Sequence, residues 1–93
     1  MIYAFAKLTV KDPGALAAYR EKAGAALALH GGKVETATAE PTPLDGTPDL
    51  PDVAALLSFP DRDAALGWIN DPELTDIHTL RHSIGASDIT LLG

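Results

Sequence analysis

The sequence predicts an α+β fold in which one four-stranded antiparallel sheet carries helices on one face. Strand and helix patterns follow one another in the order strand, helix, strand, strand, helix, strand. Two right-handed split crossovers of this order give a ferredoxin-like βαββαβ domain, here a single domain over residues 1–93. The two clearest strands are apolar on both faces, whereas the helices can cover only one face. We therefore expect a homodimer, in which two sheets pack face to face as a dimeric α/β barrel.

The two doubly apolar strands are the first and the third. The first runs from Ile2 to Val10, with Ala4 on one face and Tyr3 and Phe5 on the other. Val53 to Phe59 alternates in the same way, with apolar residues pointing to both sides. A strand with one face in water shows a cleaner alternation of apolar and polar residues. Both strands therefore belong in the middle of a sheet that is covered on each side.

The first helix has clear signals at both ends. Asp12 is the predicted N-cap, and Pro13 occupies the first helical position, where its missing N–H costs nothing. Apolar residues at three- and four-residue spacings form one face from Leu16 to His30. Gly31-Gly32 then ends the helix, because glycine readily adopts the left-handed conformation at a C-cap.

A weaker strand and a long loop follow. Val34 to Glu40 alternates in a strand-like way. The segment from Pro41 to Pro51 contains four prolines, which exclude regular structure there. We interpret this segment as the tip of a hairpin, and a functional flap is the alternative.

The second helix begins at its predicted N-cap, Asp61, and buries a stripe that includes Trp68 and Ile69. Asp71-Pro72 stops this helix, because the residue before a proline avoids the helical region, and then starts a short extra helix. The last predicted strand is Asp88 to Leu92.

Composition excludes several classes of function. The chain has no cysteine, so disulfides, thiolate catalysis and zinc-thiolate sites are absent. Its formal charge of −6 and its scattered basic residues argue against nucleic acid as a partner. It lacks a basic leader and any run of about 20 apolar residues, so we expect no membrane segment and a cytoplasmic location. No motif indicates a cofactor.

A set of short motifs spread over nearly the whole chain carries a family resemblance: Asp12-Pro13, Tyr19, His30-Gly31-Gly32, Phe59-Pro60, Ala64-Ala65, Trp68, Pro72-Glu73 and Leu80-Arg81. In order and spacing they resemble the domain of unknown function 1330 family. That resemblance implies the dimeric α/β-barrel superfamily, whose members include cofactor-free oxygenases, isomerases and small-ligand binders, but it implies no particular reaction. The family usually has aromatic residues at the positions of Ile69 and Leu74, which implies a more aliphatic pocket here.

Two side chains are candidates for chemistry. His30 ends the first helix, where the negative end of the helix dipole favours its protonated form and suits it to proton transfer. The alternative is a histidine that merely bonds free carbonyls of the last helical turn. Arg81 has the planar fork that binds a carboxylate or an enolate oxygen. Its alternative is an ion pair with Glu73, Asp76 or Asp88.

His78 and His82 have the four-residue spacing of a helical metal site. No third ligand accompanies them, so we predict no metal there. Tyr19 and Trp68 lie on inner helical faces, where they either pack in the core or line a pocket.

Three functions remain, in this order of preference. The first is a homodimeric protein that binds a small apolar or weakly acidic ligand, with Tyr19, Trp68 and Ile69 lining the pocket and His30 and Arg81 at its polar end. The second is a cofactor-free isomerase or oxygenase, in which His30 transfers a proton and Arg81 stabilises an oxyanion. The third is a purely structural dimerisation module with a fully packed interior.

Overall fold

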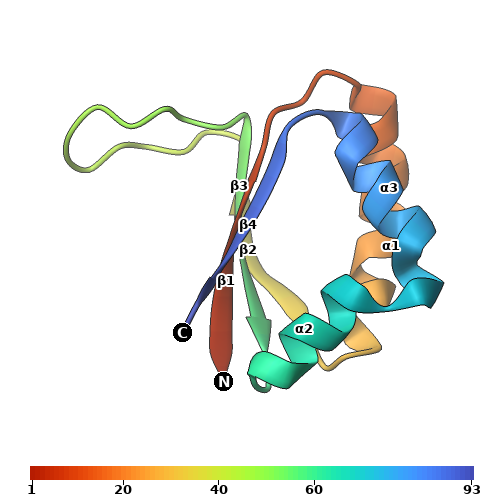
Figure 1. Ribbon diagram of the computed structural model, residues 1–93. Helices are drawn as coiled ribbons and strands as arrows, with labels where there is room; N and C mark the ends of the chain where they lie inside the picture. The colour runs from red at the N-terminus through yellow and green to blue at the C-terminus, as the bar shows by residue number, and fades with distance from the viewer.

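The computed structural model describes residues 1–93 and consists of a sheet with helices on one of its faces (Figure 1). The sheet is antiparallel with the order β2-β3-β1-β4, and its strands are β1 (Ile2–Leu8), β2 (Lys33–Thr38), β3 (Val53–Phe59) and β4 (Ser87–Leu92). The other layer contains α1 (Pro13–Ala28), α2 (Arg62–Asn70), the 3-10 turn η1 (Pro72–Leu74) and α3 (Thr75–Ile84). The predicted ferredoxin-like fold is confirmed.

The first helix begins where the sequence predicts and ends slightly earlier. Asp12 Oδ1 accepts a hydrogen bond from Ala15 N at 3.1 Å, and the helix stops at Ala28 rather than near His30. Gly31 has a φ of 71°, and Gly32 N donates to Leu27 O at 2.8 Å. This left-handed turn uses the carbonyls of the last helical residues, so the helix closes before the glycines.

β1 is also shorter than predicted. The N–H of Val10 donates to Asp52 Oδ2 at 2.7 Å. In a longer strand, the Val10 N–H would donate to a backbone carbonyl of the neighbouring strand. Here it donates to a side chain instead, and β1 ends at Leu8.

The predicted short helix after Pro72 is a 3-10 turn followed by a full helix. Asp71 Oδ1 caps the turn by accepting from Glu73 N at 2.9 Å, and α3 then runs for ten residues. No glycine or proline interrupts Thr75 to Ile84, so nothing breaks the helix. α3 packs alongside α1, which directs one of its faces into the space between helices and sheet.

The core lies between the two layers and is centred on β1, β3, α1 and α2. Phe59 and Trp68 pack with ring centroids 5.7 Å apart. Around them lie the other buried apolar residues of the cluster: Ala4, Ala26, Leu27, Leu57, Ala65 and Leu74. The residues of β4 are only partly buried on this side, so the space beside that edge strand is less filled.

The opposite face of the sheet has no helix over it (Figure 1). Tyr3 and Phe5 project there with 39% and 40% of their surfaces exposed, and Phe5 lies opposite Leu56 in the register of β1 and β3. Ser58 is the buried polar residue of this face, and its hydroxyl donates to Glu35 Oε1 at 2.7 Å. One copy of the chain therefore leaves an apolar sheet surface uncovered.

The proline-rich segment between β2 and β3 has no regular structure, as predicted. It extends from the sheet on the side away from the helices (Figure 1). Leu44 in this segment is almost fully exposed. No helix of the chain is long and apolar enough to cross a membrane.

Candidate functional site

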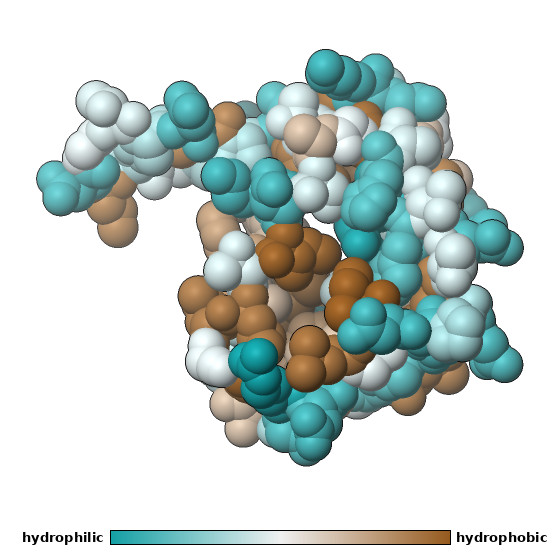
Figure 2. Space-filling model, viewed as in Figure 1, coloured by the Kyte–Doolittle hydropathy of each residue, from teal (hydrophilic) through white to brown (hydrophobic).

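A cavity of about 480 Å³ opens between the sheet and the helices on the β4 side. Figure 2 shows the hollow, with hydrophobic side chains around much of its rim. Eight of its twelve lining residues are hydrophobic, so it suits a molecule with an apolar body. Its walls are formed by Ala4, Phe59, Ala65, Leu66, Trp68, Ile69, His78, Arg81, His82, Ser87, Ile89 and Leu91.

Three elements build the wall through their regular periodicities. On α3, His78, Arg81 and His82 are spaced three and four residues apart and share one helical face. On β4, alternate residues face the helices, which places Ile89 and Leu91 in the wall. α2 contributes Trp68 and other apolar residues to the wall. The polar groups of the cavity therefore come almost entirely from α3.

Arg81 is the charged group of this wall and is only 3% exposed. Its Nη1 donates to His78 Nδ1 at 2.8 Å and, over a longer 3.4 Å, to Tyr19 Oη. The Nε of Arg81 is buried without a hydrogen-bond partner. The guanidinium carbon lies 5.3 Å from the Trp68 ring centroid and 5.9 Å from that of Tyr19. The cation is therefore held by neutral and aromatic groups.

No carboxylate pairs with Arg81. The two ion pairs of the chain are His30 with Asp71 and Lys33 with Glu35. The alternative interpretation of Arg81 as a surface ion pair is therefore wrong. Burial of an unpaired cation costs several kcal/mol, whereas cation–π contacts return about 0.5–2 kcal/mol each. An anion in the cavity would relieve this imbalance.

His78 is fixed in one tautomer by its two partners. A guanidinium can only donate, so His78 Nδ1 accepts from Arg81 and the proton of the neutral ring is on Nε2. That N–H donates to Trp68 O at 2.9 Å. Burial lowers the pKa of His78 below its ordinary value of 6.5, and the charge of Arg81 lowers this pKa further. His78 is thus a neutral hydrogen-bond acceptor for Arg81 near pH 7.

Metal binding does not fit this pair of histidines. His78 and His82 both reach the cavity wall, as their four-residue spacing suggested. Both ring nitrogens of His78 are already used, by Arg81 and by the Trp68 carbonyl. No three side chains of the metal-binding types come together in the chain.

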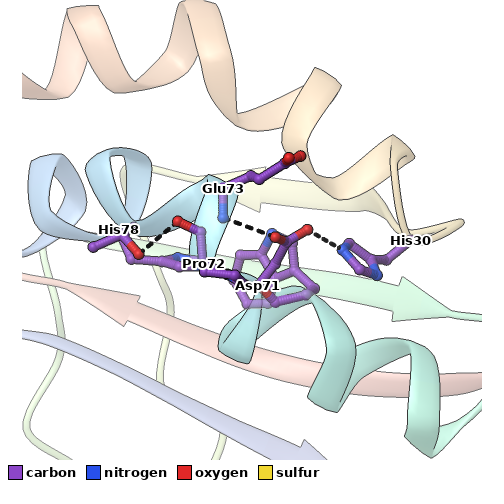
Figure 3. A network of polar contacts seen from close by, with 7 residues as sticks. His30, Asp71, Pro72, Glu73 and His78 are labelled. Carbon is purple, nitrogen blue, oxygen red and sulfur yellow. Dashed lines mark hydrogen bonds and ion pairs between the residues drawn. The ribbon is translucent and has the colours of Figure 1, made fainter.

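His30 lies at the far end of the polar network that includes His78 (Figure 3), because the Trp68 carbonyl accepts from both His78 Nε2 and Asp71 N. Its Nε2 is 2.8 Å from Asp71 Oδ2, and Asp71 also accepts from Glu73 N at 2.9 Å. The hydrogen bond from His30, followed by that from Glu73 N–H, lowers the pKa of the Asp71 carboxyl. This cluster joins the end of α1 to the turn before η1. His30, Asp71 and Glu73 do not line the cavity.

The predicted site residues are thus only partly brought together. Trp68, Ile69 and Arg81 line the cavity. Tyr19, on α1, contacts Arg81 but does not line the cavity. His30 lies apart from this group. Sequence reasoning assigned His78 to a possible metal pair and missed its contact with Arg81. The three-residue spacing of these two residues on one helix was the signal that could have revealed it.

The fold and the site define a two-layer ferredoxin-like protein with an apolar cavity and one buried guanidinium. The chain belongs to the DUF1330 family, since the model described as "Domain of unknown function (DUF1330)" matches residues 1–93. The family resemblance predicted from the sequence is confirmed. No curated protein matches the chain.

Proposed function

We propose that this protein is a homodimer that binds a small, largely apolar or weakly acidic molecule in the cavity beside β4. The observation that carries the proposal is Arg81, a buried cation without a carboxylate partner in the wall of an apolar cavity. Cavities of a few hundred Å³ with few, well-placed polar groups are typical of ligand sites. Trp68 and Ile69 would contact the apolar part of the ligand.

The uncovered sheet face supports the homodimer. The face has an apolar centre around Phe5 and Leu56 and charged residues such as Lys7 and Asp88 near its edge, as protein interfaces have. A second copy offers the same surface about a two-fold axis, which gives the dimeric α/β barrel.

Binding fits the geometry better than the enzyme hypothesis. Proton transfer by His30 onto a molecule at Arg81 requires both side chains at one site, and His30 is engaged with Asp71 outside the cavity wall. The structural-module hypothesis expects a fully packed interior, and a cavity of about 480 Å³ argues against it. Small-molecule binding is therefore the preferred function.

A native mass spectrum of the purified protein tests both parts of the proposal. We expect a dimer, and a discrete additional mass wherever ligand is retained through purification. Titration of the ligand-free protein with small apolar acids should then produce adducts of one molecule per chain. A monomer at micromolar concentration would contradict the dimer. Failure of every added apolar compound to form an adduct would contradict the binding function.

A further inference from the structure

One edge of the Arg81 guanidinium has no acceptor. Both hydrogen bonds of this side chain use Nη1, while Nε is buried without a partner and Nη2 beside it makes no hydrogen bond. Nε and Nη2 together form the edge that binds a carboxylate through two parallel N–H···O hydrogen bonds. The edge of Arg81 that makes no hydrogen bond is therefore the edge best suited to a carboxylate.

His78 anchors the Nη1 end of the Arg81 guanidinium and leaves the Nε–Nη2 edge without a hydrogen-bond partner. Its Nδ1 accepts from Nη1 at 2.8 Å, and its Nε2–H is anchored on Trp68 O at 2.9 Å. The ring also packs edge-on against the Trp68 indole, with centroids 4.8 Å apart. His78 is therefore a positioning residue, because it acts on a ligand only through Arg81.

The cavity favours a ligand with one negative charge. Arg81 is the only lysine or arginine in the wall. The chain as a whole has a formal charge of −6, which opposes the approach of a polyanion. Ile89, Leu91 and Trp68 line the same cavity as Arg81, so the rest of the ligand is expected to be hydrocarbon or aromatic.

We propose that the ligand is an apolar monocarboxylate, whose carboxylate binds the Nε–Nη2 edge of Arg81 and whose hydrocarbon body fills the cavity between β4 and α2. This inference rests on the small-molecule binding proposed above and specifies its chemical class. Arg81 lines the cavity, but its Nε has almost no accessible surface in the ligand-free chain. The proposal therefore requires Arg81 to shift toward the cavity when the carboxylate binds, with Nη1 kept on His78.

Trp68 provides a direct test, because it is the only tryptophan and belongs to the cavity wall. Its fluorescence would be titrated with octanoate and 4-phenylbutyrate, and with octanamide and 4-phenylbutanamide as neutral compounds of the same shape. We expect each acid to bind at least tenfold more tightly than its amide. In Arg81→Met this preference should disappear while amide binding is retained, and Arg81→Lys should keep only part of it. Lys11→Met, which removes a cation outside the cavity, should behave like the wild type.

The outcomes separate this inference from the proposed function. Equal binding of acid and amide to the wild-type protein would overturn the carboxylate assignment and leave small-molecule binding intact. A preference for the acids that survives in folded Arg81→Met would also overturn the assignment. If neither acids nor amides change the Trp68 signal or produce an adduct in the native mass spectrum, both proposals fail.

The positioning role of His78 is tested separately, by the preference for acid over amide in His78 variants. His78→Gln keeps an acceptor for Arg81 and should retain most of the preference for acid over amide, whereas His78→Leu should reduce this preference severalfold. A merely structural His78 would lower the binding of acid and amide by the same factor in His78→Leu.

Discussion

At the scale of the single residue, Arg81 is a buried cation without an ion-pair partner. Its hydrogen bonds go to neutral groups, and no carboxylate balances its charge. A side chain of this kind lowers the stability of the ligand-free protein, because the lost hydration of the cation is only partly replaced. Such a cost is typical of groups that are retained for binding.

This reasoning predicts that Arg81→Met stabilises the ligand-free protein by about 1 kcal/mol or more. Methionine fills a similar space without a buried charge, and this gain should exceed the loss of the hydrogen bond to His78. Urea unfolding at pH 7 measures the change. Arg20→Met, at an exposed position of α1, should change the free energy of unfolding by less than about 0.5 kcal/mol. A loss of about 3 kcal/mol in Arg81→Met would instead mean that the fold depends on the guanidinium.

His78 predicts a pH dependence of stability. Its pKa in the folded protein is lowered from 6.5, so the unfolded chain binds the proton first as the pH falls. The free energy of unfolding should therefore decrease as the pH is lowered through 6.5, and this contribution should level off below the folded pKa. Urea unfolding between pH 8 and pH 5 should show a smaller decrease in His78→Gln than in the wild type. His82→Gln, at an exposed histidine, removes only a minor cause of the lowered His78 pKa and should keep most of the larger decrease.

At the scale of the element, two glycines have opposite roles: Gly24 lies within α1, and Gly31 lies in the turn after it. Gly31 adopts a φ of 71°, and a Cβ atom there would lie 2.7 Å from Pro60 Cγ. Gly24 is in the middle of the helix, and a Cβ atom there would contact nothing within 4 Å. The first glycine is required by the turn that joins α1 to β2, and the second only weakens the helix.

The matched substitutions Gly31→Ala and Gly24→Ala should therefore move stability in opposite directions. We expect Gly31→Ala to destabilise the protein by about 1–2 kcal/mol, because of the left-handed conformation and the contact with Pro60. Gly24→Ala should stabilise it by about 0.5–1 kcal/mol through helix propensity. Thermal and urea unfolding measure both. Destabilisation by Gly24→Ala would show that this part of α1 is covered by a partner.

The elements also show how far local sequence signals reach. Val53–Phe59 was predicted at its exact bounds and the starts of α1 and α2 were predicted through Asp12 and Asp61, because alternation and side-chain caps are local. The length of α3 was missed because its N-cap position, Leu74, makes no side-chain cap.

The candidate site was less accessible from the sequence than the elements. The sequence predicts Arg81 as a candidate anion-binding residue, but its burial depends on how α3 packs against α1, which a local pattern does not contain. The same limit applies to His30, whose partner Asp71 is 41 residues away. Tertiary packing decides which polar side chains meet, whereas local periodicity decides only which face they occupy.

At the scale of the whole molecule, the uncovered sheet face dominates. Most of the core lies between sheet and helices, and only 12 of the 93 residues are buried in a single copy. Tyr3 and Phe5 lie on the inner strand β1 but remain about two-fifths exposed, because no second layer covers this face of the sheet. A chain of this size has a small core, so burial of further apolar surface adds much to its stability. Dimerisation through this face would therefore couple folding to assembly.

Phe5→Glu tests this coupling, since it places a charge near the centre of the proposed two-fold interface. We expect the variant to sediment as a monomer at concentrations where the wild type is a dimer, and to unfold at a lower temperature. The wild-type melting temperature should rise with protein concentration, as mass action requires for a dimer that unfolds to monomers. Leu29→Glu introduces the same charge at an exposed apolar position at the end of α1, and this variant should remain dimeric. A wild-type protein that sediments as a monomer, with a melting temperature independent of concentration, would mean that this sheet face is stable in water without a second copy.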